Sequence, residues 1–238
     1  MRVIVFVFVA AAAAWGQAGY PDVALDHKPM FDTACAEATK EPIDPAAVRE
    51  LQERLGEFRE FWRKEQPKLL GAVPAVTGVP FKYREAKAAL FVCGGYPSMS
   101  LPLMINMRPY LAATSRVPPA PMVDFSNVIL HEVLHRYVGE CLEALPGRTT
   151  KLLQKYSDEP PPVRNHLHLY AVMLLVYRKL GREKDLDAVW ATEKRFPKAW
   201  AVSQRAREII TEEGAENFAR ELGGGPAPKK GKGRGHAA

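Results

Sequence analysis

Apolar residues recur along much of the chain at the three- and four-residue spacing that is typical of helices. The first such stripe follows Asp44, a good helix N-cap, and Pro45, and it predicts a helix that runs to about Glu65. The same pattern predicts four further helices in the second half of the chain. They cover residues 151–156, 163–180, 185–195 and 199–222.

Short apolar runs in the first half of the chain predict a few strands. Phe81–Arg84 alternates apolar and basic residues, and residues 88–93 are nearly all apolar. Leu101–Met107 is predicted as an edge strand because Pro102 and Pro109 flank it. Residues 19–42 and 71–80 show no regular period and are predicted to be irregular or loop. The predicted fold class is therefore α+β and mostly helical.

One further helix carries the strongest chemical signal in the sequence. It is predicted over residues 125–138, with Asp124 as its N-cap and Gly139 at its C-terminal end. The motif His-Glu-x-x-His lies inside it, at His131, Glu132 and His135. Side chains four residues apart share one face of a helix, so the two imidazoles can bind one metal ion. Glu132 lies beside the first ligand, where it can act as general base.

The residues around this motif resemble those of the zincin metallopeptidases. The matching positions are Val128, Val133, Leu134 and Tyr137, whereas Arg136 departs from the usual uncharged residue. The resemblance implies a zincin-like fold: a small sheet with an edge strand, the motif helix and a C-terminal helical part. It also implies that the edge strand, here residues 101–107, pairs with the backbone of a peptide substrate.

A catalytic Zn²⁺ site needs a third protein ligand. His166 is the preferred candidate because it shares the inner stripe of the predicted helix 163–180 with Tyr170. His168 is an alternative, although it projects toward the exposed face near Lys179. Glu159 in the Pro-rich connector is a further alternative, and a thiolate from Cys141 is another.

These residues together favour a secreted zinc-dependent metallopeptidase that acts on peptide or protein substrates. Glu132 is the predicted general base, and Tyr170 or His168 could assist at the oxyanion, although helix periodicity favours ordinary core for Tyr170. Two other interpretations stay open. One is a catalytically inactive zinc-binding protein, and the other is a helical interaction domain of the cell envelope without metal.

The N-terminus has the pattern of a cleaved secretory signal peptide. Arg2 precedes an apolar stretch, and Gly16-Gln17-Ala18 is a small-x-small triplet. The apolar stretch is too short for a comfortable membrane span, which needs about 20 residues. We therefore expect a secreted or periplasmic protein without a stable membrane span after cleavage. The predicted organisation is a signal peptide (1–18), one catalytic domain (19–222) and a disordered basic tail (223–238).

The cysteine content and the net charge add little to the prediction of fold or function. Three cysteines allow at most one disulfide, and the sequence does not say which pair of Cys35, Cys93 and Cys141 forms it. Of the formal charge of +6, Arg2 supplies +1 and the tail lysines and Arg234 supply +4. The remaining +1 gives no basic face for nucleic acid. The sequence does not indicate an oligomeric state.

Overall fold

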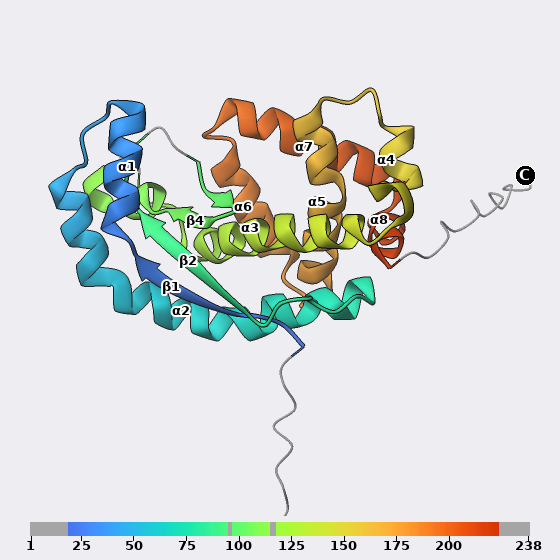
Figure 1. The fold of residues 1–238 in the computed structure, drawn as a ribbon, viewed down its shortest axis with the longest axis horizontal. Coiled ribbons are helices and arrows are strands. Elements are labelled where there is room, and N and C mark those ends of the chain that lie inside the picture. The colour runs from blue at the N-terminus through green and yellow to red at the C-terminus, as the bar shows by residue number, and fades with distance from the viewer. Residues whose placement is uncertain (1–18, 95–96, 115–117, 224–238) are drawn as a thin grey trace, which may run out of the picture.

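A computed structural model describes residues 19–94, 97–114 and 118–223, and it confirms an α+β, mostly helical fold with a small mixed sheet (Figure 1). The sheet order is β1-β2-β4-β3. β1, β2 and β4 are parallel, whereas β3 is an antiparallel edge. The predicted signal peptide and tail residues 224–238 lie outside the described residues. The four strands are β1 Asp22–His27, β2 Glu85–Phe91, β3 Met99–Ser100 and β4 Leu103–Asn106.

Helices make up most of the described chain. A long helix, α2, runs beneath the sheet in Figure 1, and α3 crosses between the sheet and the C-terminal helices. Single 3-10 turns occur at Arg108–Tyr110, Ala112–Thr114 and Pro146–Arg148. The α-helices are α1 Pro29–Thr39, α2 Pro45–Thr77, α3 Met122–Glu143, α4 Lys151–Lys155, α5 Pro161–Lys179, α6 Glu183–Glu193, α7 Pro197–Glu213 and α8 Ala215–Leu222.

The sheet is covered on both faces, which explains why β2 is apolar at successive positions. Leu90 belongs to the large core with α2 and α3, whereas Phe91 belongs to a small cluster beside α1. Neighbouring residues of a strand point to opposite faces, so both faces of β2 need apolar side chains. A disulfide between Cys35 of α1 and Cys93, just after β2, ties the small cluster together.

The edge strand is shorter than the sequence predicted. β4 occupies most of the predicted stretch 101–107, but it lies between β2 and β3 rather than at the edge. Met99 and Ser100 of β3 form the edge, and Pro102 lies in the turn between β3 and β4, where no ladder N–H is needed. The predicted strand Phe81–Arg84 is also wrong, because β2 begins at Glu85.

Helix α2 continues well beyond the predicted end near Glu65. The composition of residues 71–80, mostly glycine, proline, valine and alanine, predicts a loop, yet the helix runs to Thr77. Its last turns are fully buried at Leu69, Leu70 and Val73, so packing outweighs the local cost of proline. Gly78 ends the helix with a positive φ of 73°.

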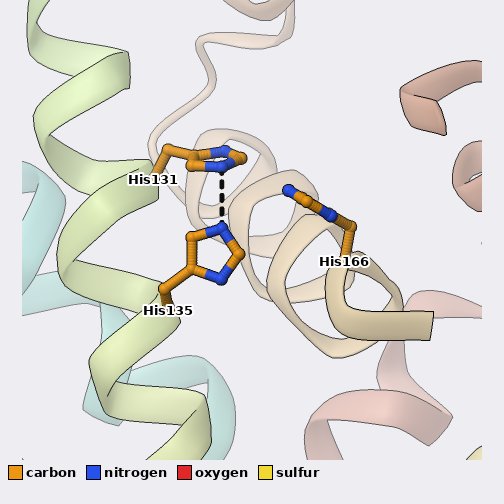
Figure 2. Close-up of side chains that lie close together, drawn as sticks. All are labelled: His131, His135 and His166. Carbon is orange, nitrogen blue, oxygen red and sulfur yellow. Dashed lines mark hydrogen bonds between the residues drawn. The ribbon is translucent and has the colours of Figure 1, made fainter. Parts of the chain in front are cut away.

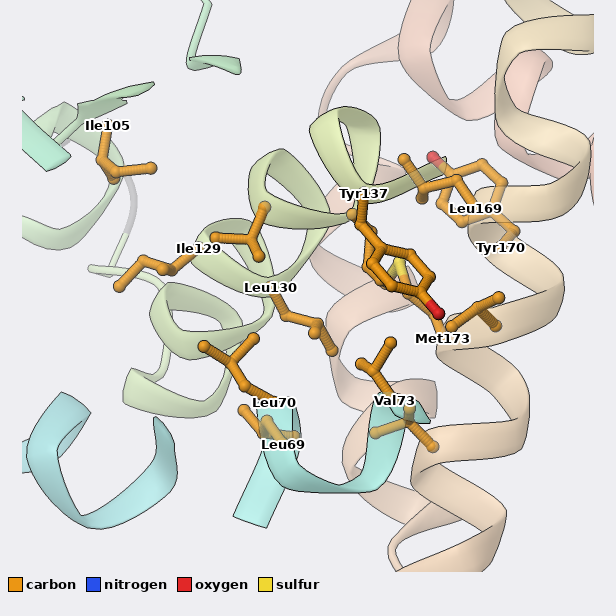
Figure 3. Packing of buried hydrophobic residues seen from close by; sticks show 14 of the residues in the cluster. Leu69, Leu70, Val73, Ile105, Ile129, Leu130, Tyr137, Leu169, Tyr170 and Met173 are labelled. Carbon is orange, nitrogen blue, oxygen red and sulfur yellow. The ribbon is translucent and has the colours of Figure 1, made fainter. Parts of the chain in front are cut away.

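Helix α3 is the central element of the core. Figure 3 shows Ile129, Leu130 and Tyr137 of α3 between residues of α2 and α5. Phe125 packs against Phe58 of α2 with ring centroids 5.0 Å apart. Burying side chains of this size contributes about 1.5–3 kcal/mol each. This packing on several sides holds the motif helix rigidly.

The ends of α3 differ from the prediction. The helix begins at Met122 after Pro121, so Asp124 lies in the first turn instead of capping it. Asp124 accepts a hydrogen bond from the Tyr110 hydroxyl at 2.9 Å. Gly139 lies inside the helix, which ends only at Glu143 because Cys141 is buried in the core.

Two other regions also correct the sequence interpretation. Residues 19–42 were expected to be irregular, yet they form β1 and α1, which pack against α2 and β2. The predicted helix 199–222 is divided into α7 and α8 at Gly214, whose φ is 86°. Within the described residues, no helix is long and apolar enough to cross a membrane.

Candidate metal centre

Helix α3 presents His131 and His135 on the face that looks toward α5. The two residues are one helical turn apart, and their Nε2 atoms lie 3.1 Å from each other. Both side chains are partly buried. The rings therefore point to one spot rather than packing side by side.

Helix α5 brings a third imidazole to the same spot. His166 lies in the second turn of α5, with its ring centroid 5.1 Å from that of His131 and 4.8 Å from that of His135. Figure 2 shows the three rings facing one another across the gap between the helices. One nitrogen from each ring lies within 4.8 Å of the other two. The sequence favoured His166 because it lies on the inner face of the helix, and in the structure that face is turned toward α3.

The electrostatics of the cluster leave ring lone pairs available. Burial and the neighbouring imidazoles hold the pKa of His131 well below its ordinary value. Burial and His166 lower the pKa of His135 to about 4. Burial also lowers the pKa of His166. Neutral imidazoles are the form that binds a metal ion, since each offers one unprotonated nitrogen.

His166 is held in a defined tautomer and orientation. Its Nδ1 lies 2.6 Å from the carbonyl oxygen of Pro162, so Nδ1 carries the proton and Nε2 keeps its lone pair. Tyr170, one turn later, stacks on the His166 ring with centroids 5.1 Å apart and 27° between the planes. A backbone carbonyl and an aromatic face thus fix the third ring.

These residues fit a divalent metal such as Zn²⁺. Zinc binds histidine nitrogen at about 2.0–2.1 Å, so two ligands of a tetrahedral site lie roughly 3.4 Å apart. The 3.1 Å separation of His131 Nε2 and His135 Nε2 is close to that value. Three neutral nitrogens with no carboxylate among them are also a donor set that zinc accepts in catalytic sites.

Glu132 lies beside the histidine cluster and between two hollows of the surface. It is 8% exposed, and burial raises its pKa to about 7. One hollow, of about 440 Å³, is a cleft that also contains His131 and His166. The other, of about 200 Å³, lies beside Leu103 of the sheet and Arg136. We call the larger of these two hollows the histidine cleft.

Arg136, which departs from the zincin pattern, has local partners. Its guanidinium lies 3.7 Å from the ring centroid of Tyr83 and forms an ion pair of 2.8 Å with Glu140. Together with Tyr83, it lines the smaller hollow.

The alternative ligands lie elsewhere. His168 is 1% exposed, so its predicted exposed position is wrong; it contacts Glu221 and Phe218 of α8. The C-terminal helices cover that face of α5, which the sequence pattern alone did not show. Glu159 forms an ion pair with Arg205 at 2.5 Å, and Cys141 is a buried free thiol near Tyr137.

Three polar residues of the cleft were not singled out as ligand-binding residues from the sequence. Asp124 and Asn127 of α3 line it, and Glu193 at the end of α6 lines it from the other side. Burial raises the pKa of Asp124 to about 6 and also raises that of Glu193. The sequence spacing between Asp124, Asn127 and His131 could have revealed that the three share a helix face. No sequence pattern near Glu193 indicates that it lies at the cleft.

Comparisons with known proteins give no relative from which a role could be transferred. No family model matches the chain, and no curated protein or solved structure matches it either. The function is therefore argued from the site itself.

Proposed function

We propose that this protein is a secreted zinc-dependent metallopeptidase with a zincin-like arrangement of edge strand, motif helix and C-terminal helices. The observation that carries the proposal is the convergence of His131, His135 and His166 next to the buried carboxyl of Glu132. A buried helix pair that needed histidines only for packing would not turn three ring nitrogens toward one point.

The three histidines would hold the zinc ion, with His166 oriented through Pro162. When bound, zinc supplies a Lewis acid that activates water and polarises a carbonyl group. Glu132 accepts a proton from the attacking water and returns it to the leaving amine. Burial raises the pKa of the Glu132 carboxyl to about 7, which suits a group that must both take and give a proton near neutral pH.

The two hollows on either side of Glu132 support peptide hydrolysis in particular. A peptide bond has an acyl side and an amine side, and cleavage at Glu132 requires room for chain on both sides. The cleft provides one side, and the hollow beside Leu103 and Arg136 provides the other. Among the described residues, no further strand pairs with the outer side of β3, so an extended substrate can pair there.

Tyr170 lines the cleft and stacks on His166, so it is placed to contact a bound substrate. Its side chain is only 8% exposed, and we assign it mainly the task of orienting His166. The disulfide between Cys35 and Cys93 supports a secreted location, since such bonds persist in oxidising compartments.

The test compares wild type with Glu132→Gln, using Glu143→Gln as a control on the exposed face of the same helix. We expect wild type to retain a single zinc ion per chain and to cleave a peptide library. Glu132→Gln should keep the zinc but lose about 10²–10⁴-fold in kcat/KM. Equal cleavage by both proteins would refute the assigned base, and wild type without zinc after reconstitution would refute the metal site.

A further inference from the structure

One end of the histidine cleft is lined by buried hydrogen-bond acceptors, and two of their oxygen atoms have no donor among the described residues. Asn127 is 3% exposed, and its Oδ1 has no hydrogen-bond partner. Glu193 Oε2 is likewise buried without a donor among the described residues, although Ser203 and Tyr170 donate hydrogen bonds to the Glu193 carboxyl group. Asp124 is 5% exposed and receives one hydrogen bond, from Tyr110. Buried acceptors without donors cost about 1–3 kcal/mol each, so this end of the cleft is incomplete without a ligand.

These acceptors and the histidines face the same cleft. Asp124, Asn127 and His131 are spaced by three and four residues on α3, which places them on one stripe of the helix. Seven residues of helix between Asp124 and His131 span about 10 Å. That is the length of about three extended residues, or of one residue together with a long side chain.

Two arginines act on the carboxyl groups only through longer-range charge: Arg195 opposes the rise in the pKa of Asp124, and Arg207 opposes the rise in the pKa of Glu193. Arg195 donates to the carbonyl oxygen of Pro118, and Arg207 lies against the rings of Trp190 and Trp200. Among the described residues, neither Asp124 nor Glu193 has an ion-pair partner within 4.0 Å; the ion pairs that do occur are elsewhere.

Apolar side chains form part of the walls around these groups. Val189, Phe196 and Val202 line the cleft beside Glu193. A ligand group that fits must therefore have several donors, a positive charge and an apolar stem. Ammonium and guanidinium groups on alkyl chains meet all three requirements.

We propose that Asp124, Asn127 and Glu193 form a subsite that binds a cationic nitrogen of the peptide substrate. This inference rests on the proposed peptidase function and names the substrate class. The nitrogen has two possible sources: the α-ammonium group of the substrate or the side chain of a lysine or arginine residue. The two carboxylates supply the charge, and Asn127 Oδ1 accepts a further N–H.

The first experiment separates these sources with matched fluorogenic peptides. Lysine, norleucine and glutamine are placed in turn at each position near the cleaved bond, with the N-terminus free or acetylated. We expect kcat/KM to be at least about 10-fold higher for the charged nitrogen at one position. Sensitivity to acetylation alone identifies the α-ammonium; sensitivity to lysine against norleucine identifies the side chain. Equal cleavage of all peptides would refute the subsite while leaving the peptidase function intact.

The second experiment uses substitutions. Glu193→Gln and Asp124→Asn should each reduce the preference for the charged peptide toward unity, whereas Asp187→Asn, on the exposed face of α6, should leave it unchanged. Two separate carboxyl variants keep the test usable if one of them fails to fold. Unchanged preference in a folded variant of either residue would overturn the assignment of that residue.

A binding measurement separates failure of the subsite from failure of the proposed function. Two pairs of ligands are titrated into Glu132→Gln protein by calorimetry. N-acetyl-lysine methylamide and N-acetyl-norleucine methylamide test for binding of a side-chain nitrogen. Lysine-free dipeptide amides with free and acetylated N-termini test for binding of the α-ammonium group. We expect the charged member of one pair to bind at least about 10-fold more tightly. Charge-selective binding without any cleavage by wild type would refute the peptidase but keep the subsite. Equal binding within both pairs would overturn the subsite.

Discussion

Two histidines on the same helix have different surroundings. His166 faces the imidazoles of α3. Among the described residues, its only hydrogen-bond partner is the carbonyl oxygen of Pro162. His168, two residues later, faces α8, where its Nε2 lies 3.2 Å from Glu221 Oε2 and 3.4 Å from Thr150 Oγ1. One ring lies among other bases, and the other is paired with an acid.

The difference shows what distinguishes a candidate metal ligand from a structural histidine. Burial alone does not separate them, because His168 is the more buried of the two. The partners do: a carboxylate and a hydroxyl satisfy His168, whereas the three-histidine cluster gathers lone pairs without an anion. The first arrangement satisfies its polar groups in the metal-free protein, and we propose that a cation completes the second.

The largest expected effect is on metal binding. His166→Ala should weaken zinc binding by more than about 1,000-fold, or about 4 kcal/mol, because it removes one of three ligands. His168→Gln is the matched control on the same helix and should keep the wild-type affinity. Competition against a chromophoric chelator measures both constants. Equal weakening in the two variants would erase the proposed distinction between the rings.

The reverse pattern is expected for the stability of the metal-free protein. His168→Ala should lower the free energy of unfolding by about 3 kcal/mol, because Glu221 would be left buried without its imidazole partner. His166→Ala should have a smaller effect, since it removes no anion partner. Urea unfolding in the presence of a chelator compares them. A greater loss for His166→Ala would contradict the structural role given to His168.

Zinc itself should stabilise the native protein through the histidine cluster. At free zinc about 100 times above Kd, the free energy of unfolding should rise by about 2.7 kcal/mol. Removal of the metal with a chelator should reverse the gain. His135→Ala should not show it, and thermal unfolding with and without zinc measures the shift. A gain of the same size in His135→Ala would indicate binding at another place.

The comparison also shows how far the sequence could predict the site. Helical spacing was enough to place His131 and His135 on one face and to favour His166 over His168, because both relations depend on the geometry of a single helix. The exposed position predicted for His168 was wrong because the covering residues Phe218 and Glu221 come from a distant helix. No local pattern encodes which segment covers a helix face.

The fold shows the same limit. The core helix α3 and the strand β2 followed from apolar periodicity, although their ends moved by a few residues. Residues 71–77 were misassigned because glycine and proline usually interrupt helices, whereas burial of Val73 and its neighbours outweighed that preference. Glu193 was missed because only the tertiary structure brings the end of α6 to the cleft.

The smallest expected effect concerns the acid that distinguishes His168 from His166. Hydrogen bonds from His168, Thr150 and the Leu152 backbone, together with the charge of His168, hold the pKa of Glu221 below its ordinary 4.5, against the effect of burial. Because the folded-state pKa is the lower one, the ionised carboxylate stabilises the protein above about pH 4.5. That contribution is lost as the pH falls through the folded-state value.

Glu221→Gln should therefore lower the free energy of unfolding by about 1–2 kcal/mol at pH 7. The difference from wild type should shrink toward zero as the pH falls below 4.5, the ordinary value for this carboxyl. Glu216→Gln is the control, because Glu216 is an exposed carboxyl on the same helix. Unfolding curves at several pH values measure the difference. If the difference in the free energy of unfolding stayed constant down to pH 3, the charge of Glu221 would not contribute to its pairing with His168. The two histidines would then not differ through a charged partner.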